Sequence, residues 1–162
     1  MRRRTEISAG LLAFRWREGR VEVLLAHPGG PFWTKKNAGA WTIPKGVVES
    51  GDLLEGALRE FNEETGFAAQ GEFVPLAPVR LSSGKTVHAF AFEGDFDPAV
   101  FSSNTFEMEW PPRSGRRRAF PEVDRIGWFE LREAEEKIIA YQRPFLAELQ
   151  TRLAKAHSPP PA

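Results

Sequence analysis

The strongest constraint on the fold is a segment near the middle of the chain, residues 53–65, in which apolar residues recur with helical spacing. These residues stand at positions i, i+3, i+4 and i+7: Leu54, Ala57, Leu58 and Phe61. Asp52, with Glu55 three residues later, has the form of a capping box, and Gly66 is a typical C-terminal stop. The segment therefore predicts a capped helix that buries one face.

A different sector of this predicted helix is acidic. Glu60, Glu63 and Glu64 stand at i, i+3 and i+4 and share a sector about 100° wide. Like charges at this spacing destabilise a helix by a few tenths of a kcal/mol per pair, and a bound cation would reverse that effect. Oxygen ligands with no Cys or His nearby favour Mg²⁺ or Mn²⁺ over Zn²⁺. For these three residues alone, a solvated charged face is the simpler interpretation. Gly56 falls in the same sector and leaves room for a ligand or another backbone segment.

Strand-like segments lie before and after the helix. Residues 7–16 and 21–27 flank a turn at Gly19 and predict a β-hairpin. We expect further strands over residues 72–80, 85–94 and 126–130. Strands on both sides of a mid-chain helix, closed by another helix, predict an α/β fold in which helices sandwich a mixed sheet.

The second half of the chain contains less regular sequence. Residues 95–121 are expected to be irregular, and residues 131–153 to form one or two helices interrupted at Pro144. No repeat or linker divides the chain. We therefore expect one domain over residues 1–155 and a disordered Pro-rich tail over residues 156–162.

Composition excludes several classes of function. The 162 residues contain 22 Lys plus Arg and 22 Asp plus Glu, and zero net charge argues against general nucleic-acid binding. The chain has no cysteine, which excludes disulfides, zinc–thiolate sites and thiol nucleophiles. No apolar run approaches the roughly 20 residues that span a bilayer. The basic start is followed by charged residues and no small-residue cleavage site, so a cytoplasmic location is favoured over a secretory signal.

The acidic segment, read with Gly46 upstream, resembles the Nudix box, G-x5-E-x7-R-E-U-x-E-E-x-G-U, where U is aliphatic or bulky and apolar. The second half matches at every fixed position: Arg59, Glu60, Phe61, Glu63, Glu64, Gly66 and Phe67. Residues 41–46, Trp-Thr-Ile-Pro-Lys-Gly, resemble the W-x-x-P-K-G approach of many family members. The first half departs, because the chain is one residue shorter between Gly46 and Arg59, and Asp52 stands nearest to the expected Glu. The chain is similar to Nudix hydrolases over about residues 6–155, in particular to bacterial predicted NTP pyrophosphohydrolases.

This resemblance implies a Nudix-type α/β/α sandwich with a mixed β-sheet. It also implies Mg²⁺-dependent hydrolysis of a phosphoanhydride bond in a small-molecule nucleotide, a nucleoside diphosphate derivative. Glu60, Glu63 and Glu64 are expected to bind the metal, with the Gly46 carbonyl as a further ligand, and Mn²⁺ is expected to be able to replace Mg²⁺.

The resemblance also implies that an acid orients or deprotonates the attacking water. The candidates are Glu63, Glu60 and a distant acid from a late loop. We choose Glu122 for the distant acid because it precedes the last predicted strand, with Glu107 and Glu109 as alternatives. A surface acid is an equally simple interpretation of Glu122.

Other residues are weaker candidates for substrate contacts. Lys45 is expected to contact phosphate, although a lone Lys in a turn is more often solvent-exposed. Arg116 and Arg118 belong to a dense basic run whose guanidinium groups suit phosphate oxygens, and a solvated charge cluster is the alternative. Three aromatic residues could stack on a base, line the cleft or anchor loops: Phe32, Trp33 and Trp110.

Three functional alternatives stay open at this point. The first is a dinucleoside polyphosphate hydrolase. The second is a non-catalytic Nudix-fold module for nucleotide binding or regulation, which loss of the metal glutamates would support, yet all three are present. The third is the isoprenoid isomerase branch of the fold, which relies on a catalytic Cys that this chain lacks. The sequence does not choose the substrate or the oligomeric state.

Overall fold

The structure is a computed structural model, and it describes residues 6–156. Its core is a seven-stranded mixed sheet in the order β4-β6-β1-β2-β9, with β3 paired to β1 and β5 paired to β6. Strands β1 and β6 run parallel, and the other pairings are antiparallel. The strands of this sheet are β1 (Ile7–Arg17), β2 (Arg20–Pro28), β3 (Lys45–Val47), β4 (Val74–Pro75), β5 (Val79–Arg80), β6 (Thr86–Glu93) and β9 (Val123–Glu130).

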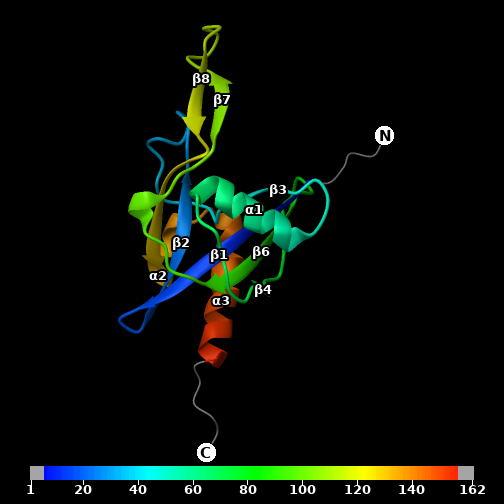
Figure 1. The fold of residues 1–162 in the computed structure, drawn as a ribbon, viewed down its shortest axis with the longest axis vertical. Helices are drawn as coiled ribbons and strands as arrows, with labels where there is room; N and C mark the ends of the chain where they lie inside the picture. Colours follow the sequence, from blue (N-terminus) through cyan, green and yellow to red (C-terminus); the bar gives the residue numbers. More distant parts are fainter. Residues whose placement is uncertain (1–5, 157–162) are drawn as a thin grey trace, which may run out of the picture.

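Helices cover both faces of this sheet, as Figure 1 shows. Neighbouring residues of β1 pack against helices on different faces of the sheet, because successive side chains of a strand point to opposite faces. Leu11 packs with Ala57 and Phe61 of α1 (Leu53–Thr65). Its neighbour Leu12 packs in the other core, with residues of α2 (Leu131–Lys137) and α3 (Arg143–Ala156). The predicted α/β/α sandwich with a mixed sheet is confirmed.

Helix α1 begins and ends where its sequence predicts. The Asp52 side chain accepts hydrogen bonds from the backbone N–H groups of Leu54 (2.8 Å) and Glu55 (3.1 Å). Gly66 ends the helix with a left-handed φ of 82°. Gly56 does leave room, but a chain segment fills it: Val48 packs so closely that a Cβ at position 56 would lie 2.6 Å from its Cγ2.

The expectation of irregular structure over residues 95–121 was wrong. A second, two-stranded antiparallel sheet forms there, from β7 (Thr105–Glu109) and β8 (Arg117–Pro121). This hairpin projects from the rest of the molecule in Figure 1. A short 3₁₀ turn, η1 (Pro98–Val100), precedes it.

Two smaller expectations also need correction. Residues 72–80 form only the two short strands β4 and β5 in place of one continuous strand. The break in the C-terminal helical region falls before Pro144, at the 3₁₀ turn η2 (Ala140–Gln142), and Pro144 itself lies in the first turn of α3. Proline is well tolerated at that position because the first N–H groups of a helix have no partner within it. Of the predicted tail, Ala156 still belongs to α3, and residues 157–162 lie outside the described part of the chain.

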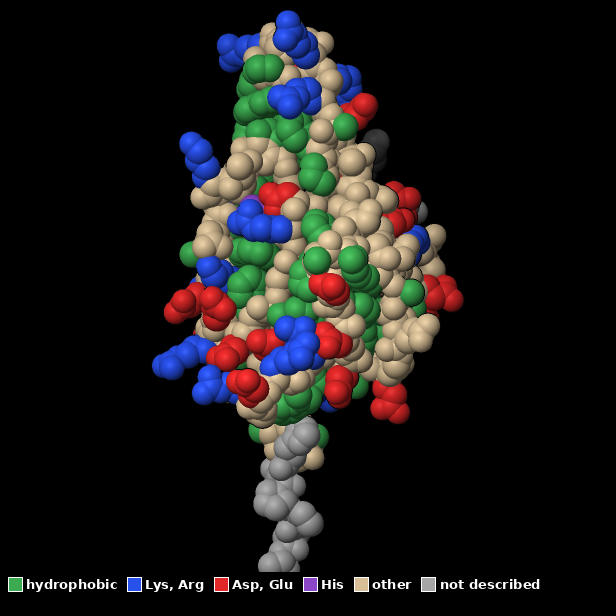
Figure 2. Space-filling view, turned by 60° about the vertical axis from the view of Figure 1, so that its left-hand side comes forward, with side chains coloured by type: hydrophobic (Ala, Val, Ile, Leu, Met, Phe, Trp, Pro, Cys, Tyr) green, Lys and Arg blue, Asp and Glu red, His purple; other side chains and the backbone are tan. Residues whose placement is uncertain are grey.

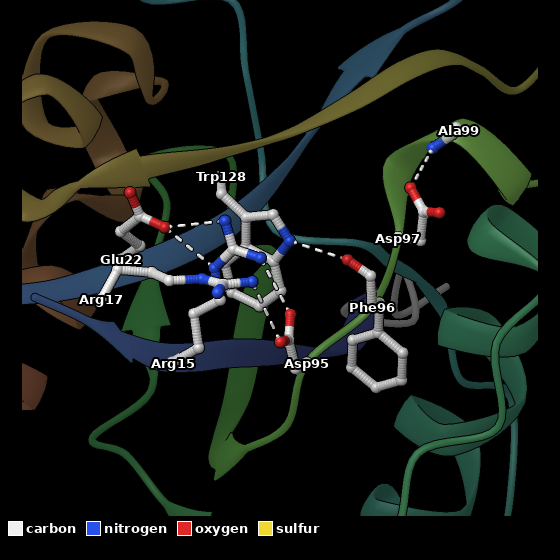
Figure 3. Close-up of polar contacts among 8 residues, drawn as sticks. All are labelled: Arg15, Arg17, Glu22, Asp95, Phe96, Asp97, Ala99 and Trp128. Carbon is white, nitrogen blue, oxygen red and sulfur yellow. Dashed lines mark hydrogen bonds and ion pairs between the residues drawn. The ribbon is translucent and has the colours of Figure 1, made fainter.

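A polar cluster fastens one end of the sheet to the segment after β6 (Figure 3). Arg15 donates to Glu22 (2.8 Å) and to Asp95 (2.8 Å), and its guanidinium lies 4.3 Å from the centre of the Trp128 ring. The Trp128 indole N–H donates in turn to the Phe96 carbonyl at 2.9 Å. The hydrogen bond from Arg15 lowers the pKa of Asp95. The cluster joins β1, β2 and β9 away from the acidic face of α1, so we assign it a structural role.

Candidate functional site

The acidic sector of α1 opens into a cleft of about 340 Å³. The cleft lies between the end of α1, strand β3 and the segments that begin and follow the β7–β8 hairpin. Its lining residues are Lys45, Gly46, Val47, Glu60, Glu63, Glu64, Asn104, Thr105 and Glu122. Six of the residues selected from the sequence therefore meet at one place: Lys45, Gly46, Glu60, Glu63, Glu64 and Glu122.

Gly46 allows Glu60 to approach the backbone of β3. A Cβ at position 46 would overlap the Glu60 carboxylate, so only glycine fits this contact. Strand β3 pairs with β1, where Gly46 lies opposite Ala9 in the ladder. The sheet thus holds the Gly46 backbone against the carboxylate.

Glu64 lies deeper in the cleft than the other acids. Its Oε1 accepts a hydrogen bond from the backbone N–H of Lys45 at 3.2 Å. Burial raises the pKa of Glu64 to about 8; Lys45 opposes this rise, and the charges of Glu60 and Glu122 add to it. A carboxylate so poorly solvated is stabilised in its charged form by a nearby cation.

Glu60 and Glu63 share one basic neighbour. The Arg59 guanidinium lies 3.6 Å from the Glu60 carboxylate and 3.9 Å from that of Glu63. Burial and the charge of Glu63 nevertheless raise the pKa of Glu60, while Arg59 lowers it. The cleft therefore carries more negative charge than its own side chains neutralise.

Glu122 comes from a distant part of the sequence, and a backbone bridge brings it to the cleft. The Asn104 N–H donates to the Glu63 carbonyl (2.8 Å), and the Glu122 N–H donates to the Asn104 carbonyl (2.7 Å). The Glu122 carbonyl accepts in turn from Gly29 N–H at 2.9 Å. Asn104 thus ties the end of α1 to the start of β9.

Three lining residues were not singled out as site residues by sequence reasoning. They are Val47, Asn104 and Thr105. Val47 follows the selected Lys45 and Gly46 in the same short strand, so it could have been included. Asn104 directly precedes a strand that the sequence did not reveal, and Thr105 is the first residue of that strand.

The structure does not bring every candidate to the cleft. Arg116 and Arg118 lie on the projecting hairpin, directly before β8 and within it, and neither lines the cleft. Figure 2 shows Lys and Arg side chains gathered around this projecting end, above apolar ones. Glu107 pairs with Arg117 (3.8 Å), and Glu109 accepts from the Arg113 N–H (2.6 Å), so both alternatives to Glu122 lie on the hairpin.

The donor set of the cleft fits a hard divalent cation. All candidate ligands are oxygen atoms, and the Glu64 carboxylate is largely buried near other acidic side chains. Within residues 6–156, no three acidic or His side chains already stand at metal-binding distances from one another. In this arrangement the Glu60 and Glu63 carboxylates both lie within ion-pair distance of Arg59.

A wider groove of about 790 Å³ lies between α2 and α3, but it is not a comparable site. Glu135 is its only acid, and Arg132 and Arg143 lie beside it. Among the described residues, no helix is long and apolar enough to cross a membrane.

Known proteins share this architecture. The Ap4A hydrolase of C. elegans aligns with a TM-score of 0.65 and 22% identity, over 91% of this chain and 98% of that one. A MutT protein from Methanosarcina mazei Go1 aligns with a TM-score of 0.61 and 24% identity, over 94% and 98%. The NUDIX domain of Shewanella oneidensis NrtR, solved with ADP ribose, aligns with a TM-score of 0.64 and 14% identity, over 93% and 90%. At these identities the likeness establishes the fold.

The sequence itself matches the NUDIX domain family over residues 5–149, which includes every residue that lines the cleft. The chain therefore belongs to the NUDIX family and is a hydrolase that acts on phosphoanhydrides.

Proposed function

We propose that the chain hydrolyses a phosphoanhydride bond in a nucleoside diphosphate derivative, as an NTP pyrophosphohydrolase does, with Mg²⁺ as cofactor and Mn²⁺ able to replace it. The observation that carries the proposal is the meeting of four carboxylates and the Gly46 backbone in one cleft. The partners are small-molecule nucleotides of the cytoplasm.

The metal-holding residues in this proposal are Glu60, Glu63 and Glu64, with the carbonyl of Gly46. A bound divalent cation supplies charge neutralisation for the phosphates and acidifies water at the site. The buried position of Glu64 and the contact of Glu60 with Gly46 hold these two side chains in place before substrate arrives. Such preorganisation limits the reorganisation needed during the reaction.

In the chemical step a water oxygen attacks phosphorus, and the bridging P–O bond breaks towards the leaving phosphate. Glu63, Glu60 or Glu122 orients the water and accepts its proton. Glu122 suits this role by position, because it lines the cleft from outside α1 and its backbone is held there by Asn104.

Lys45, Arg116 and Arg118 are proposed to contact substrate phosphates. Lys45 lines the cleft together with the proposed metal ligands, so it would suit the phosphates nearest the metal. Arg116 and Arg118 lie further out on the hairpin, so they suit a phosphate chain that extends beyond the cleft. Such a chain is what a dinucleoside polyphosphate would present, and this placement is the observation that favours that second substrate class.

A phosphate-release screen over a nucleotide panel with Mg²⁺ tests the proposal. The panel should contain nucleoside triphosphates, dinucleoside polyphosphates and nucleotide sugars. Glu63→Gln removes one cleft carboxylate, and Glu133→Gln is the matched control, because Glu133 is an exposed acid on α2. Turnover that Glu63→Gln removes and Glu133→Gln preserves supports the proposal. Absence of turnover on the whole panel, with nucleotide binding retained, would favour the non-catalytic module.

A further inference from the structure

A buried histidine joins three segments of the chain beside the acidic cleft. The His27 side chain, near the end of β2, is buried. Its Nδ1 lies 2.9 Å from the Asp124 carboxylate at the start of β9, and its Nε2 lies 2.6 Å from the Lys36 carbonyl in the loop that follows β2. Carboxylate and carbonyl oxygens accept hydrogen bonds, so both ring nitrogens donate. His27 and Asp124 therefore form a hydrogen-bonded pair, the His27–Asp124 clamp, that links β2, β9 and this loop.

Neighbouring side chains hold the clamp in place. The Trp41 ring packs edge-on against the His27 ring, with 5.2 Å between the ring centres. The Arg125 guanidinium lies 5.2 Å from the centre of the Trp41 ring and 3.9 Å from the Asp124 carboxylate. A hydrogen bond between a buried ring N–H and a carboxylate is costly to leave unmade. The position of Asp124 is therefore closely tied to that of His27.

Asp124 is the extra residue in an irregular ladder between β2 and β9. His27 pairs with Arg125, but the next residue, Pro28, pairs with Val123, so the ladder passes over Asp124. One extra residue on one strand is the arrangement of a β-bulge, which redirects the side chains beyond it and is common beside active sites. Because the clamp holds Asp124, it also fixes the place of the bulge.

The bulge decides which residues before it enter the core. Side chains of a regular strand alternate, so Asp124 and Glu122 would point to the same face as buried Ile126. With the extra residue in the strand, Val123 packs in the same core cluster as Ile126 instead. Glu122 is left to line the acidic cleft. The bulge thus keeps the carboxylate of Glu122 out of the apolar core.

The segment that carries Glu122 also contacts the residues that follow His27. The Gly29 N–H donates to the Glu122 carbonyl (2.9 Å), and the Glu122 N–H donates to the Asn104 carbonyl (2.7 Å). A Cβ at position 29 would overlap the Pro121 carbonyl oxygen, so the two backbone segments touch. A shift of the clamp would therefore move the backbone of Glu122 directly.

We propose, on the basis of the proposed function, that His27 and Asp124 are positioning residues for the reaction. The clamp holds the bulge, and the bulge places the Glu122 carboxylate in the cleft, where it orients the attacking water. Neither His27 nor Asp124 lines the cleft, so both act through Glu122.

Amide hydrogen exchange in EDTA tests the clamp without turnover. Asp124→Ala should speed exchange of the Gly29 and Glu122 amides about tenfold or more, because it removes a hydrogen bond to a charged group. The Leu76 amide, which donates to the Ala89 carbonyl (2.9 Å) elsewhere in the sheet, should exchange at the wild-type rate. Asp124→Asn should keep most of the protection, since its side-chain oxygen can still accept from the histidine ring.

Asp97→Ala is the matched control for this exchange experiment. Asp97 also accepts a hydrogen bond through its side chain, from the Ala99 N–H at 2.9 Å, and it does not line the cleft. Its loss should leave the Gly29 and Glu122 amides protected. Equal exchange of these two amides in wild type and Asp124→Ala overturns the proposal. Equal acceleration at Leu76 also overturns it, because that result marks a general loss of stability.

Turnover tests whether the clamp acts through Glu122. Asp124→Ala should lower kcat by about tenfold to a hundredfold and change KM for a nucleoside triphosphate by less than about twofold, because a misplacement of about 1 Å can cost roughly a hundredfold in rate. In a Glu122→Gln background, Asp124→Ala should lower kcat no further. A purely structural role would lower kcat by the same factor in both backgrounds, and that result overturns the proposal.

The two measurements separate failure of the clamp from failure of the proposed function. If the wild-type protein hydrolyses no nucleotide, the proposed function fails alone, and amide exchange still decides whether the clamp holds Glu122. If the wild-type protein hydrolyses nucleotides and Asp124→Ala leaves the exchange unchanged, the clamp fails alone.

Discussion

The Glu60 carboxylate occupies the space that a Cβ on Gly46 would take. Helix α1 therefore contacts strand β3 through the carboxylate of Glu60 and the Cα of Gly46. Gly46 adopts no left-handed φ, and its need for glycine comes from this contact rather than from backbone conformation. This contact explains why the site needs a glycine at position 46 as well as the carboxylate of Glu60.

Gly46→Ala should therefore damage catalysis more than stability. The added methyl group must displace the Glu60 carboxylate, and a misplacement of about 1 Å can cost roughly a hundredfold in rate. We expect kcat to fall by about that factor, with the melting temperature in EDTA near the wild-type value because Glu60 has room to rotate into the cleft. A mutant with wild-type kcat at saturating Mg²⁺ would remove Glu60 from the metal site.

Glu64→Gln should lower kcat without lowering stability at pH 8. A glutamine can still accept the Lys45 N–H through its side-chain oxygen, and it carries no charge to bury. The loss of a metal ligand should cost more than the roughly 10–100-fold that follows loss of an outer-shell partner. Steady-state kinetics and thermal melts on the same preparations measure both effects. Turnover close to wild type at saturating Mg²⁺ would contradict the role of Glu64.

The raised pKa of Glu64 predicts how metal-free stability depends on pH. The raised pKa keeps a proton on Glu64 of the folded protein up to about pH 8, whereas the unfolded chain releases it near the ordinary glutamate pKa of 4.5. Stability should therefore fall as pH rises through this window, by at most about 1.4 kcal/mol per pH unit for one proton. Urea unfolding between pH 5 and pH 8 in EDTA measures the slope.

Glu64→Gln is the control for this pH dependence, because it cannot titrate. The slope should flatten in the mutant, although the raised pKa of Glu60 adds a smaller contribution in the same direction. Saturating Mg²⁺ should flatten the wild-type slope as well, since a bound cation favours the charged carboxylates. Identical slopes for wild type and mutant in EDTA would show that Glu64 titrates normally.

The cleft should prefer metal ions that favour oxygen ligands. Thermal melts should show stabilisation by Mg²⁺ or Mn²⁺ and little gain from Zn²⁺, because the cleft contains no His or Cys. Glu64→Gln should weaken the Mg²⁺-dependent shift, and Glu133→Gln should preserve it. A shift with Zn²⁺ alone would place the site elsewhere.

The sequence predicted the parts of the fold that depend on local rules. Asp52 and Gly66 delimit α1 because a side-chain acceptor and a left-handed residue satisfy the helix ends. The near-continuous apolar runs of β1 and β2 follow from burial of both sheet faces. The acids at positions 60, 63 and 64 share a helix face by geometry alone, so their meeting at one cleft could be foreseen.

The hairpin and the contacts of the loop that follows β2 could not be foreseen in the same way. The residues of β7 and β8 are mostly exposed, and charged residues such as Glu107 and Arg117 occupy them, so no buried pattern marks the strands. Nothing in the sequence indicated that buried His27 contacts Asp124 (2.9 Å) and the Lys36 carbonyl (2.6 Å), because these groups reach it only through tertiary structure. Contacts between distant segments, not local propensity, determine these features.

The basic residues of the hairpin give the last prediction, tested by the triple change of Arg116, Arg117 and Arg118 to Ala. Among the described residues, Arg116 and Arg118 have no carboxylate within ion-pair distance, while Arg117 pairs with Glu107. Each charge-assisted contact to a phosphate contributes roughly 1.5–3 kcal/mol when desolvated, so the loss of one should raise KM about tenfold or more. Because the hairpin rises away from the cleft, we expect this effect for long substrates such as dinucleoside polyphosphates and little effect for short ones. KM values and their salt dependence, measured on both substrate classes, decide the matter. If both stay unchanged for every active substrate, the arginines are solvated charges outside the site.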